Sequence, residues 1–354
     1  MAASAEPAPP PLLGGVRVID FSSNLPGPYA TLLLAQLGAD VVKVEPPGGD
    51  PARAFPRLFA AVNQGKTSEC LDLKSEAGRA RGRELVRDAA VVVEGWRPGV
   101  AARLGLGYGD VRGEYPDSVY VSISGYGQTG DRAGAPGHDV NYQAEAGILA
   151  VDPTHVPAVP VLPVADMASG LFAAFAACAA LFAVARGQGG RFIDVSMTDV
   201  ALTWTLPRLD LADGGDVFTR TPHYGVYACS DGRALALGIV HEQHFWRGFC
   251  QVVGLDDLAG ATYEQRCDDP RLRAVVADAV AGWPRDELLA RLQAADVPAS
   301  AVRMPWEAVG AEAFAHRGTV HRTAGTATIG HPAQYTPGGG GAAGPLAAAP
   351  AAQR

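Results

Sequence analysis

The strongest constraint on the fold is a regular alternation of short apolar strands with helix-like segments across the first two hundred or so residues. Helices are predicted at 29–37, 76–88 and 100–115, between strands predicted at 16–21, 40–45, 70–73, 90–94, 118–124 and 191–195. A strand, a helix and a second strand within about thirty residues match the length of a βαβ unit. The alternation therefore predicts an α/β fold with a large Rossmann-like, doubly wound parallel sheet, helices on both faces and a ligand at the carboxyl ends of the strands.

A second pattern begins after the large domain. Tyr224 to Ser230 and Ala234 to Val240 predict an antiparallel pair joined by Asp231-Gly232, a strong hairpin signal. Helices are predicted next, at 244–253, 271–281 and 285–294. We therefore expect a large domain at 12–205, a smaller α+β domain at 206–305 and a return to the large domain at 306–335. The ends, 1–11 and 336–354, are rich in Ala, Pro and Gly, and we expect both to be disordered tails.

Composition narrows the function. The net charge of −8 leaves no excess of cations to displace the counterions of a nucleic acid, so nucleic-acid binding is not expected. A single anionic ligand is still allowed, because a few well-placed Arg and Lys suffice for it. The five cysteines are scattered without a CxxC pair, which predicts free thiols in a reducing compartment and no metal site.

One stretch has the length of a membrane span. Ala168 to Ala185 carries no charge, but it consists mostly of alanine. A helix packed in a core or a dimer interface is the better interpretation. The N-terminus lacks the basic and apolar regions of a signal peptide. We therefore expect a cytoplasmic protein with no membrane partner.

Three places could carry chemistry, and each has an ordinary structural interpretation. His138 opens a predicted helix and could be a surface histidine. Asp166 precedes the Ala-rich helix and could be its N-cap, although the same position suits a base or a nucleophile. His241-Glu242 follows the hairpin and could be a solvated turn. Sequence spacing alone does not choose between these interpretations.

Cations near strand ends are the candidates for a nucleotide. Lys43, Arg97 and Arg103 lie at or just after predicted strands, where a doubly wound sheet gathers phosphates. The loop at Gly27 does not follow the GxGxxG pattern, so a dinucleotide fingerprint is absent.

Several motifs, in order along the chain, resemble those of family III CoA-transferases, the CaiB/BaiF family. The likeness covers about residues 12–334 and is carried by Gly27-Pro28, Leu37 to Glu45, Leu71 to Lys74, Glu94-Gly95-Trp96-Arg97-Pro98-Gly99, Ser124 to Gly130, Gly137-His138-Asp139 and Tyr224 to Leu237. Within the family, Gly-His-Asp-x-Asn-Tyr at 137–142 is similar to the α-methylacyl-CoA racemase branch. The transferase branch usually has another residue in place of His138.

The resemblance implies an intertwined homodimer with an acyl-CoA substrate and no cofactor beyond the CoA of that substrate. Each active site would lie between the large domain of one subunit and the small domain of the other. The implied CoA-binding residues are Lys43, Leu71, Glu94, Arg97, Arg103, Gly137 and Tyr142.

The resemblance also implies roles in catalysis. His138 and Asp166 would act as two bases on opposite faces of the α-carbon, and the main-chain N–H of Asp139 would stabilise the enolate oxygen. Glu242 from the partner subunit would orient His138. The hairpin exit allows either Glu242 or His241 at the acidic position, and Phe245-Trp246 stays in register with Glu242.

Two alternatives stay open. In a CoA transferase Asp166 would be the nucleophile and His138 would be incidental. In a non-catalytic homologue the chain would bind an acyl-CoA or a carrier-bound thioester without turnover. Leu162 motivates this second alternative, because an Asn is common in racemases four residues before the Asp.

Overall fold

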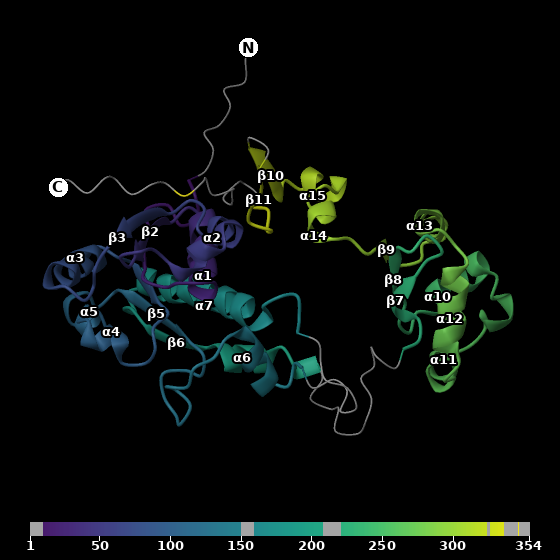
Figure 1. Cartoon of the computed structure of the whole chain (residues 1–354), viewed down its shortest axis with the longest axis horizontal. Helices are drawn as coiled ribbons and strands as arrows, with labels where there is room; N and C mark the ends of the chain where they lie inside the picture. The colour runs from purple at the N-terminus through teal and green to yellow at the C-terminus, as the bar shows by residue number, and fades with distance from the viewer. Residues whose placement is uncertain (1–9, 150–158, 208–220, 324–325, 336–345, 347–354) are drawn as a thin grey trace, which may run out of the picture. The chain divides into compact units, whose positions relative to one another are not determined.

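The structure is a computed structural model that describes residues 10–149, 159–207, 221–323, 326–335 and 346 (Figure 1). Apart from Pro10, Pro11 and Leu346, the two tails predicted to be disordered lie outside the described residues. The chain divides into two compact units, residues 1–206 with 312–354, and residues 207–311. The sequence had placed these divisions after residues 205 and 305.

The larger unit is built on a six-stranded sheet in the order β3-β2-β1-β4-β5-β6. Every neighbouring pair of its strands is parallel. The order reverses between β1 and β4, so the loops after these two strands diverge and leave a crevice. The predicted doubly wound α/β fold is confirmed. The strands are β1 (Arg17–Asp20), β2 (Asp40–Glu45), β3 (Thr67–Cys70), β4 (Val91–Glu94), β5 (Val119–Ser124) and β6 (Phe192–Ser196).

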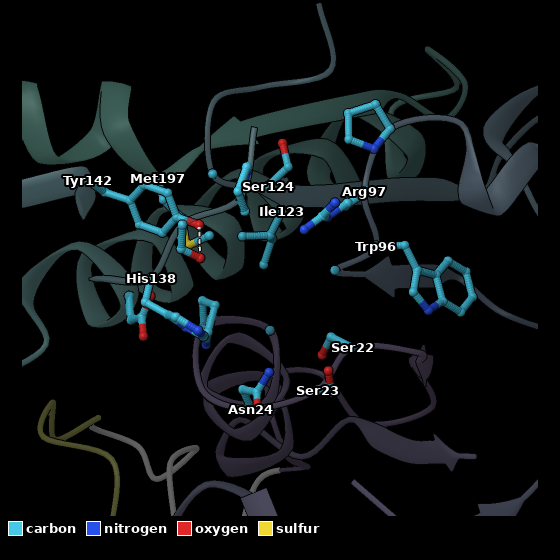
Figure 2. A pocket seen from close by; sticks show the side chains of 18 of the residues that line it. Ser22, Ser23, Asn24, Trp96, Arg97, Ile123, Ser124, His138, Tyr142 and Met197 are labelled. Atoms are coloured by element: carbon cyan, nitrogen blue, oxygen red, sulfur yellow. Dashed lines mark hydrogen bonds between the residues drawn. The ribbon is translucent and has the colours of Figure 1, made fainter. Parts of the chain in front are cut away.

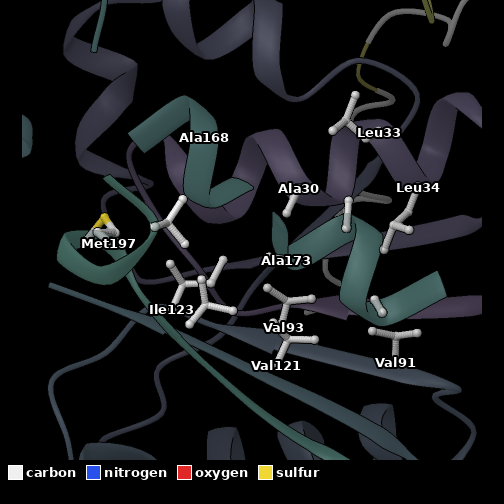
Figure 3. Close-up of a cluster of buried hydrophobic side chains, with 14 of the residues drawn as sticks. Ala30, Leu33, Leu34, Val91, Val93, Val121, Ile123, Ala168, Ala173 and Met197 are labelled. Carbon is white, nitrogen blue, oxygen red and sulfur yellow. The ribbon is translucent and has the colours of Figure 1, made fainter. Parts of the chain in front are cut away.

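Apolar clusters lie on both sides of this sheet, as expected for strands buried on two faces. On one side, valines of β4 and β5 pack against α1 (Pro26–Gln36) and α7 (Val164–Ala185), and Figure 3 shows this cluster. On the other side, Leu85 and Val86 of α3 (Glu76–Arg87) join Val111 of α5 (Tyr108–Glu114). The remaining helical and strand segments are η1 (Pro51–Ala54), α2 (Pro56–Val62), α4 (Val100–Arg103), α6 (Asp139–Glu145), α8 (Met197–Thr203), α15 (Glu312–His316), β10 (Val320–Thr323) and β11 (Thr326–Ile329).

The Ala-rich segment forms α7, a helix of 22 residues. It is long and apolar enough to cross a membrane by length and composition, the one such helix among the described residues. Its small residues, from Ala165 to Ala180, face the core and let the helix lie close to α1. Phe175 and Phe182 on the other side are exposed. The helix is thus a core element on one face and an uncovered apolar surface on the other.

Some predicted boundaries were wrong. The third strand is Thr67–Cys70 and not 70–73, and α1 begins at Pro26 rather than at Tyr29, because proline suits the first turn of a helix. The single helix predicted at 100–115 is two short helices, α4 and α5, separated by a turn at Gly105, whose φ is 68°. The α2 helix was not predicted.

The smaller unit contains the predicted hairpin. Antiparallel β7 (Tyr224–Ala228) and β8 (Ala234–Gly238) are joined by β9 (Ala299–Ala301) in one sheet. A core centred on Trp246 and Phe249 lies against these strands. The helices are α10 (Gln243–Val253), η3 (Asp256–Leu258), α11 (Tyr263–Asp268), α12 (Leu272–Ala281), α13 (Arg285–Ala294) and α14 (Pro305–Ala308).

Candidate active site

A cavity of about 290 Å³ opens where β1, β4 and β5 end. Figure 2 shows His138 and Tyr142 on one side of it and Trp96 and Arg97 on the other. Its position at the reversal of strand order is the place where this fold class binds ligands. The polar side chains that line it are Ser22, Ser23, Asn24, Trp96, Arg97, Ser124, His138, Tyr142 and Asp166.

Asp166 reaches this cavity from the first turn of α7. The residue before the helix is Pro163, so Asp166 is not the N-cap, and the structural interpretation of this residue does not hold. Close packing of α7 on α1 fixes its position, because a Cβ at Gly170 would lie 2.6 Å from the carbonyl oxygen of Pro26. Only glycine permits this approach one turn after Asp166.

The pKa of Asp166 is raised to about 7, first by burial of its carboxyl group and then by the negative charge of Asp139. The main-chain N–H of Asp166 donates to Oδ1 of Asp139 at 3.0 Å, which holds the two residues together. Gln143 donates to the other carboxylate oxygen of Asp139. Two acidic groups therefore lie side by side, and one of them changes its protonation near neutral pH.

His138 precedes α6 and has an exposed side chain that lines the same cavity. Its main-chain N–H donates to Oδ1 of Asn141 at 3.0 Å. The hydroxyl of Tyr142 donates to the carbonyl of Gly137 at 2.7 Å, which ties this loop to α6. The string at 137–142 thus makes a local turn that directs His138 to the cavity, where Asp166 also lies.

A second cavity of about 600 Å³ lies at the ends of β1, β2 and β3. Its walls are largely apolar, with Leu71, Val100 and Leu104 among them. Three residues, Ser22, Ser23 and Trp96, line both cavities. The two cavities are therefore adjacent and are separated by these three shared residues.

The structure distributes the predicted CoA-binding residues over different positions. Arg97, Gly137 and Tyr142 line the first cavity and Leu71 lines the second. Arg103 is exposed on α4 and lines neither.

Lys43 and Glu94 are buried beside the cavities. Lys43 is fully buried, with its Nζ atom 2.8 Å from Oδ2 of Asp50 and donating to the carbonyl of Ser22 at 3.0 Å. Glu94 is buried beneath the loop that carries Trp96. Neither side chain lines either of these two cavities.

Sequence reasoning missed the loop after β1. Ser22, Ser23 and Asn24 all line the first cavity, and Asn24 has a φ of 63°, in the left-handed region. Below this loop, Lys66 lies 3.1 Å from Oδ2 of Asp20, and both side chains are fully buried. A polar run directly after the first strand was the signal that could have marked this loop.

The small-unit candidates lie at the start of α10. Oε2 of Glu242 accepts the main-chain N–H of Val240 at 2.9 Å, and hydrogen bonds from the main chain lower the pKa of this carboxyl. His241 directly precedes Glu242, and its carbonyl accepts from Arg266 at 3.5 Å. Both residues belong to the smaller unit and His138 to the larger.

Metal binding was not expected, and no group of three or more His, Cys, Asp or Glu suited to a metal ion occurs in the part of the chain that the structure describes.

Comparisons with known proteins agree on one family and include more than one activity. Residues 13–351 match the model of a family described as CoA-transferase family III. The chain is 31% identical to acetyl-CoA:oxalate CoA-transferase of Acetobacter aceti over 91% of its own length and 88% of that protein. It is also 31% identical to human alpha-methylacyl-CoA racemase, over 76% of this chain and 72% of that protein.

Solved structures agree with these matches. A CAIB/BAIF family protein from Brucella suis is similar with a TM-score of 0.84 and 26% identity, over 95% of each chain. Rv3272 from M. tuberculosis is similar with the same TM-score and 29% identity, over 96% of this chain and 97% of that one.

Proposed function

The chain belongs to CoA-transferase family III, and on that premise we propose that it inverts the α-carbon of 2-methylacyl-CoA thioesters. The observation that carries this proposal is the pair of titratable side chains, His138 and Asp166, on the walls of one cavity. A carboxyl group with a pKa of about 7 is about half ionised at neutral pH. It can therefore both take and return a proton under the same conditions.

In the proposed reaction one group removes the α-proton and the other supplies a proton to the opposite face. When Asp166 acts as a carboxylate base, the imidazolium of His138 is the acid, and the roles reverse for the other epimer. The thioester oxygen gains negative charge in the enolate between the two transfers. Main-chain N–H groups at the start of α6, that of Asp139 first, are the donors we assign to it. The mechanism needs no cofactor beyond the CoA of the substrate.

We also propose that the working enzyme is an intertwined homodimer in which Glu242 of the partner subunit orients His138. The exposed apolar face of α7, with Phe175 at 70% exposure, supports a second copy as its cover. Light scattering after gel filtration tests this, and a monomer mass at micromolar concentration would contradict it.

The test of the reaction is proton NMR of the purified protein with one epimer of a 2-methylacyl-CoA in D2O. We expect deuterium at the α-position together with the opposite epimer. Absence of exchange with several acyl chains would contradict the proposal. Tight binding of the same thioesters without exchange or transfer would instead identify a non-catalytic homologue.

The second candidate is a CoA transferase, and the relatives named acetyl-CoA:oxalate and succinate--glutarate CoA-transferase favour it. There the ionised carboxylate of Asp166 would attack the thioester carbonyl, and CoA would leave as thiolate from the tetrahedral intermediate. A mixed anhydride between the acyl group and Asp166 would remain. The thiolate would then attack the aspartyl carbonyl, releasing the first acid and forming an aspartyl-CoA thioester. An acceptor carboxylate would take the CoA by the same two steps in reverse.

One substitution separates the two candidates. His138→Ala removes one of the two bases, so it should abolish racemisation but leave most transferase activity. CoA passing from the acyl-CoA to an added oxalate or succinate, at a rate unchanged in His138→Ala, would establish the transferase.

A further inference from the structure

The wall between the two cavities consists of Ser22, Ser23 and Trp96, and we call these three residues the partition. They lie just after β1 and β4, the adjacent strands at which the sheet order reverses. All three are labelled in Figure 2, where they come from two different loops. A wall made from two loops keeps its shape only if both loops are fixed.

Each loop is held by a buried carboxylate at the last position of its strand. Oδ1 of Asp20 accepts the main-chain N–H of Ser22 at 2.9 Å. Oε2 of Glu94 accepts the main-chain N–H of Trp96 at 2.7 Å. The two contacts have the same form, from the end of a strand to the residue two positions later, and Asp20 and Glu94 are 0% and 3% exposed.

The Ser22 side is further fixed by close contacts. The hydroxyls of Ser22 and Thr31 both donate to Asp20. A Cβ at Gly27 would lie 2.1 Å from Oγ of Ser22, so the loop is tight against the start of α1. The ring of Phe21 lies 5.4 Å from that of Trp96, centroid to centroid, which connects the two halves of the partition.

The Trp96 side depends on Glu94. Its other carboxylate oxygen accepts from Ser122, whose Oγ in turn accepts from Nε2 of Gln128 at 2.8 Å. No Lys or Arg forms an ion pair with Glu94 among the residues that the structure describes. Burial raises the pKa of this carboxyl above its ordinary value. Burying a carboxyl without a cation is unfavourable, so the chain keeps Glu94 at a cost in stability.

We propose that Glu94 is a positioning residue that fixes Trp96, and with it the partition, so that one acyl-CoA spans both cavities. Its reacting carbon would lie in the cavity of His138 and Asp166, and its long CoA chain would pass over the partition into the apolar cavity of Leu71. The inference rests on the proposed function only for the identity of the ligand, and it holds for a racemase or a transferase.

The test compares two substrates in Glu94→Leu. One is a full 2-methylacyl-CoA, and the other is the same acyl group on N-acetylcysteamine, which lacks the nucleotide and most of the pantetheine arm of CoA. For acyl-CoA we expect kcat/KM to fall by about 10- to 100-fold, the range for loss of a buried hydrogen bond to a charged group. For the short thioester we expect a fall of less than about threefold. Equal losses for both substrates would overturn the proposal, because a merely structural role lowers both alike.

Glu94→Gln is the matched control, because its amide oxygen can still accept the Trp96 N–H. It should recover most of the acyl-CoA activity lost in Glu94→Leu, and failure to recover it would also contradict the proposal. If Glu94→Leu does not fold, Trp96→Leu replaces it, with the same expected difference between the substrates.

Calorimetric binding of free CoA separates this inference from the proposed function. If the wild-type chain turns over neither substrate but binds CoA, Glu94→Leu should weaken that binding at least tenfold. Equal affinity in the two proteins would overturn the positioning role of Glu94, whatever reaction the chain catalyses.

Discussion

Two regions of the larger unit contain a buried aspartate, and the pKa of its carboxyl group is shifted in opposite directions in the two regions. At the ends of β1 and β2, Asp20 faces Lys66 and Lys43 faces Asp50, with all four side chains at 0% or 1% exposure. At the starts of α6 and α7, Asp166 has the like charge of Asp139 beside it. The pKa of Asp20 falls to about 2, and that of Asp166 rises to about 7.

Burial is not the source of this difference, because it raises the pKa of both carboxyl groups and is the largest influence on each. At Asp20 the charges of Lys66 and Lys43, together with hydrogen bonds from Ser22 and Thr31, outweigh the effect of burial. A buried carboxylate that faces cations stays ionised, and one that lies beside a like charge can change its protonation state near neutral pH. We call Asp20, Lys66, Lys43 and Asp50 the scaffold region. We call Asp166 with Asp139, at the starts of α7 and α6, the reactive region.

Asp166→Asn removes the ionisable carboxyl group of the reactive region, and we expect it to have the largest effect on activity. We expect the α-proton exchange rate to fall by about 10²- to 10⁴-fold, the usual contribution of a general base. The measurement is deuterium incorporation in D2O. An exchange rate within about threefold of the wild type would remove Asp166 from the mechanism.

Lys66→Met removes the buried ion pair with Asp20 in the scaffold region. It leaves Asp20 without the partner that lies 3.1 Å away, so we expect the free energy of unfolding to fall by about 3–5 kcal/mol. Urea denaturation measures this. Arg271→Met is the matched control, because the Arg271 side chain in the ion pair with Asp269 is 84% exposed, so its removal should leave the free energy of unfolding almost unchanged.

Asp166→Asn should also make the protein more stable at pH 7, in the opposite direction to Lys66→Met. The folded pKa of Asp166, about 7, lies above the ordinary 3.8, so between these values the unfolded chain ionises while the folded chain stays protonated. The free energy of unfolding of the wild type therefore falls as the pH rises through this window, whereas that of Asp166→Asn does not. A shift from 3.8 to about 7 corresponds to a gain on the order of 4 kcal/mol at pH 7, which disappears near pH 4. A variant less stable than wild type at pH 7 would contradict this.

Asp139→Asn removes the negative charge beside Asp166, and we expect its effect to be smaller than those of Asp166→Asn and Lys66→Met. Removing the neighbouring negative charge should lower the pKa of Asp166, so the limb of the pH–rate profile that reports it moves down by less than about one pH unit. Glu145→Gln on the same helix is the control, because Glu145 is partly exposed and pairs with Arg132. Equal pH profiles for Asp139→Asn and the wild type would show that Asp139 does not act on Asp166.

The sequence predicted the architecture well because apolar alternation records burial. Asp40–Glu45 and Arg285–Ala294 have the predicted bounds, and Glu76–Arg87 differs by one residue from the prediction. The site was harder to predict from the residues alone. His138 and Asp166 are 28 positions apart, and only the packing of α6, α7 and the sheet brings them to one cavity.

The two buried ion pairs of the scaffold region were not predicted from the sequence. Lys43 looked like a phosphate ligand because it lies within a strand that ends at the ligand edge. The turn after β2 brings Asp50 back onto it, and that contact depends on the path of a loop whose polar residues give no periodic signal. The same holds for Lys66 and Asp20, which are 46 positions apart.

The contrast between the two regions is tested most directly by measuring the pKa of the Asp166 carboxyl group in the folded protein. Carbon NMR of the protein labelled at the aspartate carboxyls, with Asp166 assigned by comparison with Asp166→Asn, follows the group through pH 3 to 9. We expect a midpoint near 7 that falls in Asp139→Asn. A midpoint near 4 in the wild type would show that the carboxyl is fully ionised at neutral pH, and the contrast between the two regions would not hold.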